Sequence, residues 1–174
     1  ASIGGSLSKT YDGTTAATNA TVVSTITGAV TGDTLTLNTS GVSLAYDSAH
    51  APTASKITAT GSGTLAINSA QASSVASDYS FTAPSIAAAT ASITPKVLTS
   101  TASIGGTLTK TYDGTTAATG AGVSSAVTGG IIGDTLSLDT TGVTLAYNSA
   151  HVATANLIAA TGSSSLAISS PTAS

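Results

Sequence analysis

The sequence predicts an all-β protein built from tandem small domains, and three observations support this prediction. Ser and Thr make up roughly a third of the 174 residues, well above ordinary usage, while Glu, Arg and Met are absent. Thr, Val, Ile and Tyr suit a pleated sheet better than a helix. Short apolar–polar alternations recur between Gly- and Pro-bearing turns. The third observation is an internal duplication.

The duplication sets the domain organisation. The segment Lys9–Thr18 returns letter for letter at Lys110–Thr119, an offset of 101 residues that holds throughout the repeat. A period of this length is too long for a solenoid rung and suits an independent domain. We therefore expect two domains arranged end to end: residues 1–96 as a complete β repeat, and residues 97–174 as a second repeat lacking its C-terminal strands.

Alternation and turn signals place the strands of the first copy. We expect them at Val22–Thr27, Thr34–Asn38, Val42–Tyr46, Lys56–Ala59, Thr64–Asn68, Tyr79–Thr82 and Ala89–Thr94. The segment Gly61–Gly63 is typical of a hairpin turn. Several short strands separated by turns favour an Ig-like sandwich, with a β-grasp-like fold as the alternative.

The second copy ends at the equivalent of Ser73, so it has no counterpart of residues 74–101. A β domain without these strands exposes unpaired edges, which can accept strands from another subunit. We expect residues 74–101 to perform that completion or to bridge adjacent domains.

Charge excludes several classes of function. Charged residues make up 6% of the chain, its net charge is -3, and its four bases are all Lys. Such a chain cannot neutralise a run of phosphates, so we expect no nucleic-acid partner. No apolar run reaches the length of about 20 residues that spans a bilayer. Cys is absent, so no disulfide framework is expected.

The motif Tyr-Asp-Gly occurs once in each copy, as Tyr11, Asp12 and Gly13 and as Tyr112, Asp113 and Gly114. We interpret it as a structural turn. Tyr packs across a sheet, Asp accepts hydrogen bonds from backbone amides, and Gly supplies a positive φ.

No cofactor is expected, and calcium is the alternative to be tested. A calcium site needs several converging oxygens. The carboxylates that could contribute to one are Asp12, Asp33, Asp47, Asp113 and Asp134. The sequence has no Asp-x-Asp-x-Asp-Gly loop, and Asp33 and Asp134 are also typical turn residues.

The other candidate groups are few. His50 and His151 lie in equivalent loops with no second His or Cys near them, so we expect no metal site there. Asn19 and Asn38 begin formal glycosylation sequons. There is no Gly-x-Ser-x-Gly elbow and no pair of carboxylates spaced for glycoside hydrolysis. We therefore expect no enzymatic activity.

The ordered motifs resemble the YDG-type repeats of large, filamentous-haemagglutinin-like bacterial adhesins. In the first copy these motifs are Lys9–Thr15, Gly32–Asp33, Ala45–Tyr46, Asp78–Tyr79 and Ile93–Lys96. The second copy repeats the first three, at Lys110–Thr116, Gly133–Asp134 and Ala146–Tyr147.

The resemblance implies an extracellular structural or adhesive module at a bacterial cell surface or in a secreted protein, with roles in cell adhesion and biofilms. The alternative is the protomer of an extracellular filament completed by strand donation between subunits. The expected partners are neighbouring copies or adjacent repeats, and host or matrix glycans or proteins. Nucleic acid and a membrane span are not expected.

Overall fold

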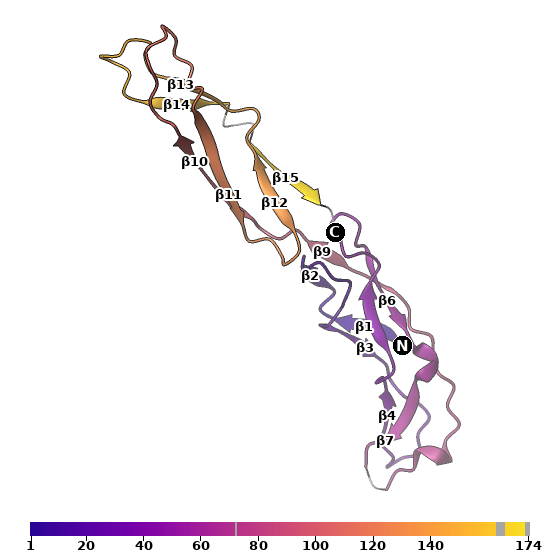
Figure 1. Ribbon diagram of the computed structural model, residues 1–174. Coiled ribbons are helices and arrows are strands. Elements are labelled where there is room, and N and C mark those ends of the chain that lie inside the picture. The colour runs from indigo at the N-terminus through magenta and orange to yellow at the C-terminus, as the bar shows by residue number, and fades with distance from the viewer. Residues whose placement is uncertain (72, 163–165, 173–174) are drawn as a thin grey trace. The chain divides into compact units, whose positions relative to one another are not determined.

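The computed structural model describes residues 1–71, 73–162 and 166–172. The chain divides into two compact units, Ala1–Pro95 and Lys96–Ser174, which are described separately below (Figure 1). The all-β prediction is confirmed, since the described residues form strands, turns and two short 3-10 segments, η1 (Ser62–Thr64) and η2 (Ala76–Asp78).

The first unit is a set of small sheets. Its strands are β1 (Ser2–Gly5), β2 (Ser8–Thr10), β3 (Ala20–Val23), β4 (Leu35–Asn38), β5 (Ser43–Tyr46), β6 (Lys56–Thr60), β7 (Ala66–Ser69), β8 (Ala89–Thr90) and β9 (Ser92–Thr94). Antiparallel pairs join β1 to β3 and β4 to β7, and β6 lies between β5 and β8. The strands β2 and β9 pair in parallel, although more than eighty residues of chain separate them.

The core of the first unit forms where the closing strands β8 and β9 meet the rest of the unit. In β9, buried Ile93 stands between exposed Ser92 and Thr94, the alternation of a strand with one face on a core. Ile93 and Ala91 are buried in one cluster with Ile3, Ala17, Tyr46 and Ile57, and Ile57 is fully inaccessible. The closing segment therefore supplies part of the core.

The second unit repeats most of this pairing. Its strands are β10 (Thr99–Gly106), β11 (Ala121–Thr128), β12 (Thr135–Asp139), β13 (Thr144–Tyr147), β14 (Ile158–Thr161) and β15 (Ala167–Thr172). All its pairs are antiparallel: β10 with β11, β12 with β15, and β13 with β14. Figure 1 shows β10 and β11 as a long two-stranded ribbon. Residues 107–113, which include the counterparts of β2, form no strand.

Three local predictions need correction. Gly61–Gly63 does not make a hairpin, because β6 pairs with β5 and β7 pairs with β4, and the glycines lead into η1 between two sheets. Tyr79–Thr82 is not a strand. The strands β1 and β2 were not expected, because Gly4, Gly5 and Lys9 weaken the local β signal and distant partners supply the pairing.

The described sheets have two or three strands each, and the Ig-like sandwich and its β-grasp-like alternative remain predictions. Within the described part of the chain, no helix has the length and apolar character needed to cross a membrane.

Candidate functional site

Each Tyr-Asp-Gly loop is closed by a lysine. The Lys9 ammonium donates hydrogen bonds to Asp12 Oδ1 at 2.7 Å, to the carbonyl of Thr14 at 2.7 Å and to the carbonyl of Ala16 at 3.2 Å. Lys110 makes the same contacts in the second unit, with Asp113 at 2.8 Å and with the carbonyls of Thr115 and Ala117 at 2.9 Å. In each copy, one lysine ammonium thus organises the seven residues of loop that follow it.

The aspartate of the motif is the second organiser of the loop. Asp12 Oδ1 accepts from the amide and the hydroxyl of Thr14, both at 3.0 Å. The hydrogen bond from Lys9 is the main reason that the pKa of Asp12 falls from 3.8 to about 2, and the Thr14 amide adds to the effect. Lys110 and Thr115 lower the pKa of Asp113 to about 2 in the same way.

The glycine of the motif has a backbone conformation that favours glycine. Gly13 has φ 78° and Gly114 has φ 75°, in the left-handed region that side chains with a Cβ rarely adopt. The sequence Tyr-Asp-Gly therefore fixes a tight turn whose carboxylate points back at the lysine.

The lysine also attaches the loop to a tyrosine on the neighbouring strand. Lys9 Nζ lies 5.2 Å from the ring centroid of Tyr46, at the end of β5. Lys110 Nζ lies 5.5 Å from the ring centroid of Tyr147, at the end of β13. Such cation–π contacts add modest stabilisation at exposed sites. Loop, lysine and tyrosine form one structural element in both copies.

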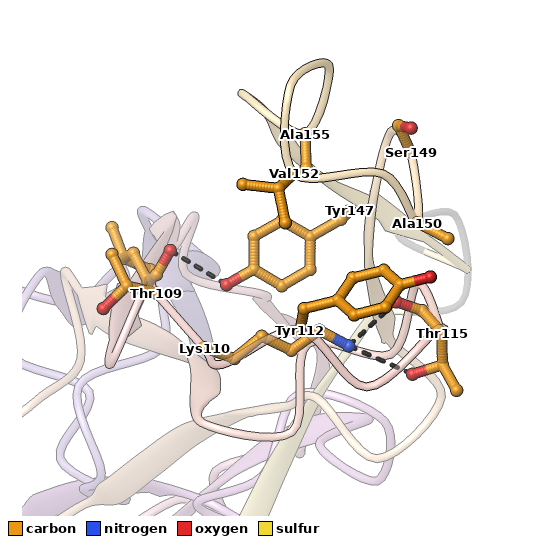
Figure 2. A pocket seen from close by; sticks show the side chains of 10 residues that line it. Thr109, Lys110, Tyr112, Thr115, Tyr147, Ser149, Ala150, Val152 and Ala155 are labelled. Atoms are coloured by element: carbon orange, nitrogen blue, oxygen red, sulfur yellow. Dashed lines mark hydrogen bonds between the residues drawn. The ribbon is translucent and has the colours of Figure 1, made fainter.

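The two copies differ in what covers this tyrosine. Tyr46 is 4% exposed within the core that Ala91 and Ile93 complete. Tyr147 is only half-buried and lines a cavity of about 170 Å³. Figure 2 shows the rings of Tyr147 and Tyr112 with the Lys110 side chain around this hollow.

We call this surface the Tyr147 groove and define it by Leu108, Tyr147, Val152, Ala155 and Leu157. The first four residues line the cavity of about 170 Å³. An adjoining hollow of about 400 Å³ shares Leu108, Tyr147 and Ala155 and includes Leu157. The Tyr147 hydroxyl donates to the Leu108 carbonyl at 2.9 Å. The groove is aromatic and aliphatic, and the positive charge of nearby Lys110 is balanced by Asp113.

The carboxylates predicted as calcium candidates lie apart, each with partners of its own. Asp12 and Asp113 are held by the lysines. Asp47 accepts from the Ser55 amide at 2.9 Å and hydroxyl at 2.7 Å, which lowers its pKa to about 2. Asp134 lies in the turn that its amide closes onto the Ile131 carbonyl at 3.2 Å. Among the described residues, no three acidic or imidazole side chains gather as a metal site.

Asp33 has a role that the sequence did not indicate. Its carboxylate accepts from the Tyr79 hydroxyl at 2.5 Å, and Ser74, which is buried, donates to it at 3.3 Å. The hydrogen bond to Asp33 raises the pKa of Tyr79. Gln71 donates to the carbonyl of Gly32 at 3.0 Å. Gln71, Ser74 and Tyr79 therefore hold the turn at Asp33 in the first unit.

The remaining candidates lie on the surface. His50 and His151 are exposed in equivalent loops, where their backbone carbonyls close the turn and no described His, Asp or Cys gathers around them. Asn19 is exposed at a turn. Asn38 lies in β4, where its side-chain oxygen accepts from the Ser40 amide at 3.0 Å. The use of Asn19 and Asn38 as glycosylation sites stays a prediction.

The sequence reasoning did not find the Tyr147 groove. The motifs at Lys110 and Tyr147 were recognised, but Leu108, Val152 and Leu157 were not singled out. One signal was available: Leu157 stands where the first copy has Lys56, and Val152 where it has Ala51. Both changes add apolar surface, and both side chains are exposed, Val152 by 75% and Leu157 by 59%.

A comparison with protein families matches the YDG domain to residues 1–88 and again to residues 94–173. The chain belongs to the YDG domain family. The two matches follow the duplication, one for each copy. No match was found among curated proteins or among solved structures.

The family match requires corrections. It names the YDG domain and no adhesin, and the name YDG is given to the SRA-YDG domain, which binds DNA and methylcytosine. On that assignment the resemblance to filamentous-haemagglutinin-like adhesins is wrong. The adhesive or stalk function and the alternative of a filament protomer completed by strand donation are wrong for the same reason.

The predictions that depended on an adhesive function are wrong for the same reason. These are the cell-surface or secreted location, the role in biofilms, and the expected partners, namely neighbouring repeats and host or matrix glycans or proteins. The exclusion of nucleic acid is corrected as well. That exclusion considered phosphate neutralisation alone, whereas bases can also be held by stacking on aromatic rings.

Proposed function

We propose that the chain is a non-catalytic binding module in which the first YDG unit is a closed scaffold and the second presents the Tyr147 groove to a ligand. One observation carries the proposal: equivalent tyrosines are buried beneath Ala91 and Ile93 in one unit and line an open cavity in the other. Exposed apolar surface of this kind marks binding sites in soluble proteins.

The chemistry of the groove favours a neutral ligand with apolar faces. The Lys110 ammonium already has Asp113, two carbonyls and the Thr115 hydroxyl as acceptors, so its charge is compensated. The rings of Tyr112 and Tyr147 offer flat surfaces, and Val152 and Ala155 add aliphatic ones. Such a surface suits stacking and van der Waals contact rather than ion pairing.

The absence of catalysis is part of the proposal, and the state of the carboxylates supports it. Asp12, Asp47 and Asp113 are each stabilised in the charged form with a pKa of about 2. A general base works best when its pKa lies near the operating pH, which these groups do not approach.

A titration followed by NMR tests the proposal. The ¹⁵N-labelled chain is titrated separately with decapeptides of neutral sequence, neutral oligosaccharides and duplex DNA. At least one class should shift the amides of Leu108 and residues 155–158 saturably, and the equivalent amides of Leu7 and residues 54–57 should not move. The proposal is wrong if no class does so, or if both units respond equally.

A matched pair of variants makes the test specific. Val152→Asp places a charge in the groove and should abolish the shifts. Ile132→Asp introduces the same charge at a fully exposed apolar residue of the second unit outside the groove, and should leave the shifts intact.

Binding to methylated DNA is the second candidate function, and the YDG family match favours it. The charge distribution gives little support to DNA binding, because two of the four lysines form ion pairs with Asp12 and Asp113. Binding would therefore depend on bases held by aromatic rings, with few phosphate contacts and a shallow salt dependence.

Fluorescence anisotropy distinguishes this candidate. Two duplexes of the same sequence are compared, with and without 5-methylcytosine, at low and at physiological salt. Saturable binding that depends on the methyl group would establish the DNA-binding role, whereas no binding at low salt would exclude it.

A further inference from the structure

The Tyr-Asp-Gly loops hold both of the Asp–Gly peptide bonds in the chain, Asp12–Gly13 and Asp113–Gly114. An Asp–Gly bond is a reactive point of a polypeptide, because the amide nitrogen of the glycine can attack the side chain of the aspartate. Glycine has no Cβ to hinder that attack. The side chains of Asp12 and Asp113 are 51% and 53% exposed, so water reaches both. The same reaction is therefore available at equivalent places in the two units.

The reaction rearranges the backbone and leaves its atomic composition unchanged. The glycine nitrogen forms a bond to Cγ of the aspartate, and one carboxyl oxygen leaves as water with the amide proton and the carboxyl proton. A second water opens the succinimide ring at the former main-chain carbonyl, which breaks the bond between that carbon and the glycine nitrogen. The product is isoaspartate. The neutral carboxyl is the form that reacts, because a carboxylate resists a nucleophile.

Three donors hold one oxygen of the Asp12 side chain in the first unit. Oδ1 accepts from the Lys9 ammonium at 2.7 Å, and from the amide and the hydroxyl of Thr14, both at 3.0 Å. The hydrogen bond from Lys9 is the first cause that lowers the pKa of Asp12 from 3.8 to about 2. At neutral pH this reduces the population of the neutral carboxyl by between about tenfold and a hundredfold.

The second unit has the same arrangement around Asp113. Its Oδ1 accepts from the Lys110 ammonium at 2.8 Å, and from the amide and the hydroxyl of Thr115, both at 3.0 Å. The pKa of Asp113 is lowered to about 2, again with the lysine as the first cause. Ring closure moves both oxygens of a carboxyl group, so in either unit it must break the hydrogen bonds that hold Oδ1.

We propose that each Tyr-Asp-Gly loop is a latent site of isoaspartate formation, which the loop lysine keeps inactive by holding the aspartate as a hydrogen-bonded carboxylate. The proposal concerns the covalent state of the loop and does not depend on the proposed binding function. Isoaspartate at position 12 would place the carboxylate directly on Cα and add a carbon to the backbone before Gly13. The hydrogen bonds that join Lys9 to this loop would then be lost.

The test follows isoaspartate in the full chain, incubated at neutral pH in native buffer and in urea. An endoproteinase that cleaves before aspartate but not before isoaspartate, followed by mass spectrometry, measures the product at each position. In native buffer Asp12 and Asp113 should both react more slowly than in urea by about tenfold or more, since urea removes the hydrogen bonds of the lysines. Equal rates in the folded and unfolded chain would overturn the proposal.

Substitution of one lysine at a time assigns the protection. Lys9→Met should raise the native rate at Asp12 by about tenfold or more and leave the rate at Asp113 unchanged. Lys110→Met should do the reverse. Each variant thus carries its reference in the other unit, where the loop has the same sequence. Lys56→Met, at an exposed lysine outside both loops, is the matched control and should change neither rate. An unchanged rate beside the substituted lysine would overturn the proposal.

A second comparison separates this chemical role from a general effect on folding. In urea, Lys9→Met and the unchanged chain should form isoaspartate at Asp12 at the same rate. A faster reaction of the variant in urea would overturn the proposal, because the effect would then arise from the sequence and not from the folded loop.

Thr14→Val keeps the test decisive if Lys9→Met unfolds the first unit, which the amide signal of Ile57 reports. This variant removes the hydroxyl donor to Asp12 and leaves the lysine in place. It should give a smaller rise in the native rate at Asp12 than in urea, with no change at Asp113. A folded Thr14→Val chain with no rise at Asp12 would overturn the proposal.

Discussion

The two units carry the same loop, the same lysine and the same tyrosine, yet only one of them has a closed core. In the first unit Tyr46 and Ile57 are buried beneath β8 and β9. In the second unit Tyr147 and Ile158 remain half-buried, and Ala118 is the buried apolar residue among those described. In the first unit, the segment that holds β8 and β9 supplies the side chains that close the core over this framework.

Paired substitutions of the central isoleucine should show the largest difference. Ile57→Ala removes a fully buried side chain and should lower the free energy of unfolding of the first unit by about 2–5 kcal/mol. Ile158→Ala removes a half-exposed side chain and should cost the second unit about 1 kcal/mol. Urea unfolding followed by NMR signals of each unit measures both. Equal costs would show that the two cores are equally closed.

Weakening the closing strand should make the first unit resemble the second. Ile93→Ala leaves a cavity beside Tyr46 and should lower the local stability of the segment by roughly 2 kcal/mol or more. Nitration with tetranitromethane and peptide mapping should then find Tyr46 reactive, as we expect the exposed Tyr112 and the half-buried Tyr147 to be in the unchanged chain. Val97→Ala, at an exposed side chain, is the control. A Tyr46 that stays protected would contradict the account.

The lysine of the loop should matter less than the core. Lys9→Met removes the donor to Asp12 and to two carbonyls, with an expected loss of about 1–2 kcal/mol. The pKa of Asp12 should return from about 2 toward 3.8, because the Lys9 hydrogen bond is the first cause of its depression. Carboxyl-carbon NMR measures this shift. Lys56→Met, at an exposed side chain, should leave the pKa of Asp12 unchanged.

The smallest expected difference between the two units is the effect of acid on the loop that follows β5 in the first unit and β13 in the second. The pKa of Asp47 is lowered to about 2 by Ser55, so its stabilisation is complete above pH 3.8 and is lost as the pH falls through about 2. In the second unit Asn148 accepts from the Asn156 and Leu157 amides at 3.1 and 3.2 Å and does not titrate.

Amide exchange at Ser55 and Asn156 between pH 4 and pH 2 measures this difference. Ser55 should lose protection in acid while Asn156 keeps it. The variant Asp47→Asn should abolish the difference. Parallel loss at both residues would show that the carboxylate is not its source.

The sequence was sufficient to predict what local chemistry determines. The duplication could be recognised by direct comparison of the two halves of the sequence. The all-β class and the turn residues Asp12 and Gly13 could be recognised because composition and turn chemistry depend on residue types and near neighbours. The strands β4, β5, β6 and β9 lie close to their predicted positions for the same reason.

The features that could not be predicted depend on contacts between residues far apart in the chain. The strand β2 exists because β9 pairs with it, and residues 109–111 with nearly the same sequence form no strand. The link from Tyr79 to Asp33 and the exposure of Tyr147 likewise depend on which segment packs where. Propensity cannot supply such information, because tertiary contacts decide the outcome.

The difference in closure between the two units is tested most directly by the hydrogen-exchange rates of two backbone amides that have the same neighbouring residues in the sequence. Tyr11 and Tyr112 both lie in Lys-Thr-Tyr-Asp-Gly, so their intrinsic exchange rates are the same. The Tyr11 amide donates to the Thr94 carbonyl at 2.9 Å, and the Tyr112 amide has no such strand beside it among the described residues. The account predicts slow exchange at Tyr11 and fast exchange at Tyr112; equal protection of the two amides would contradict it.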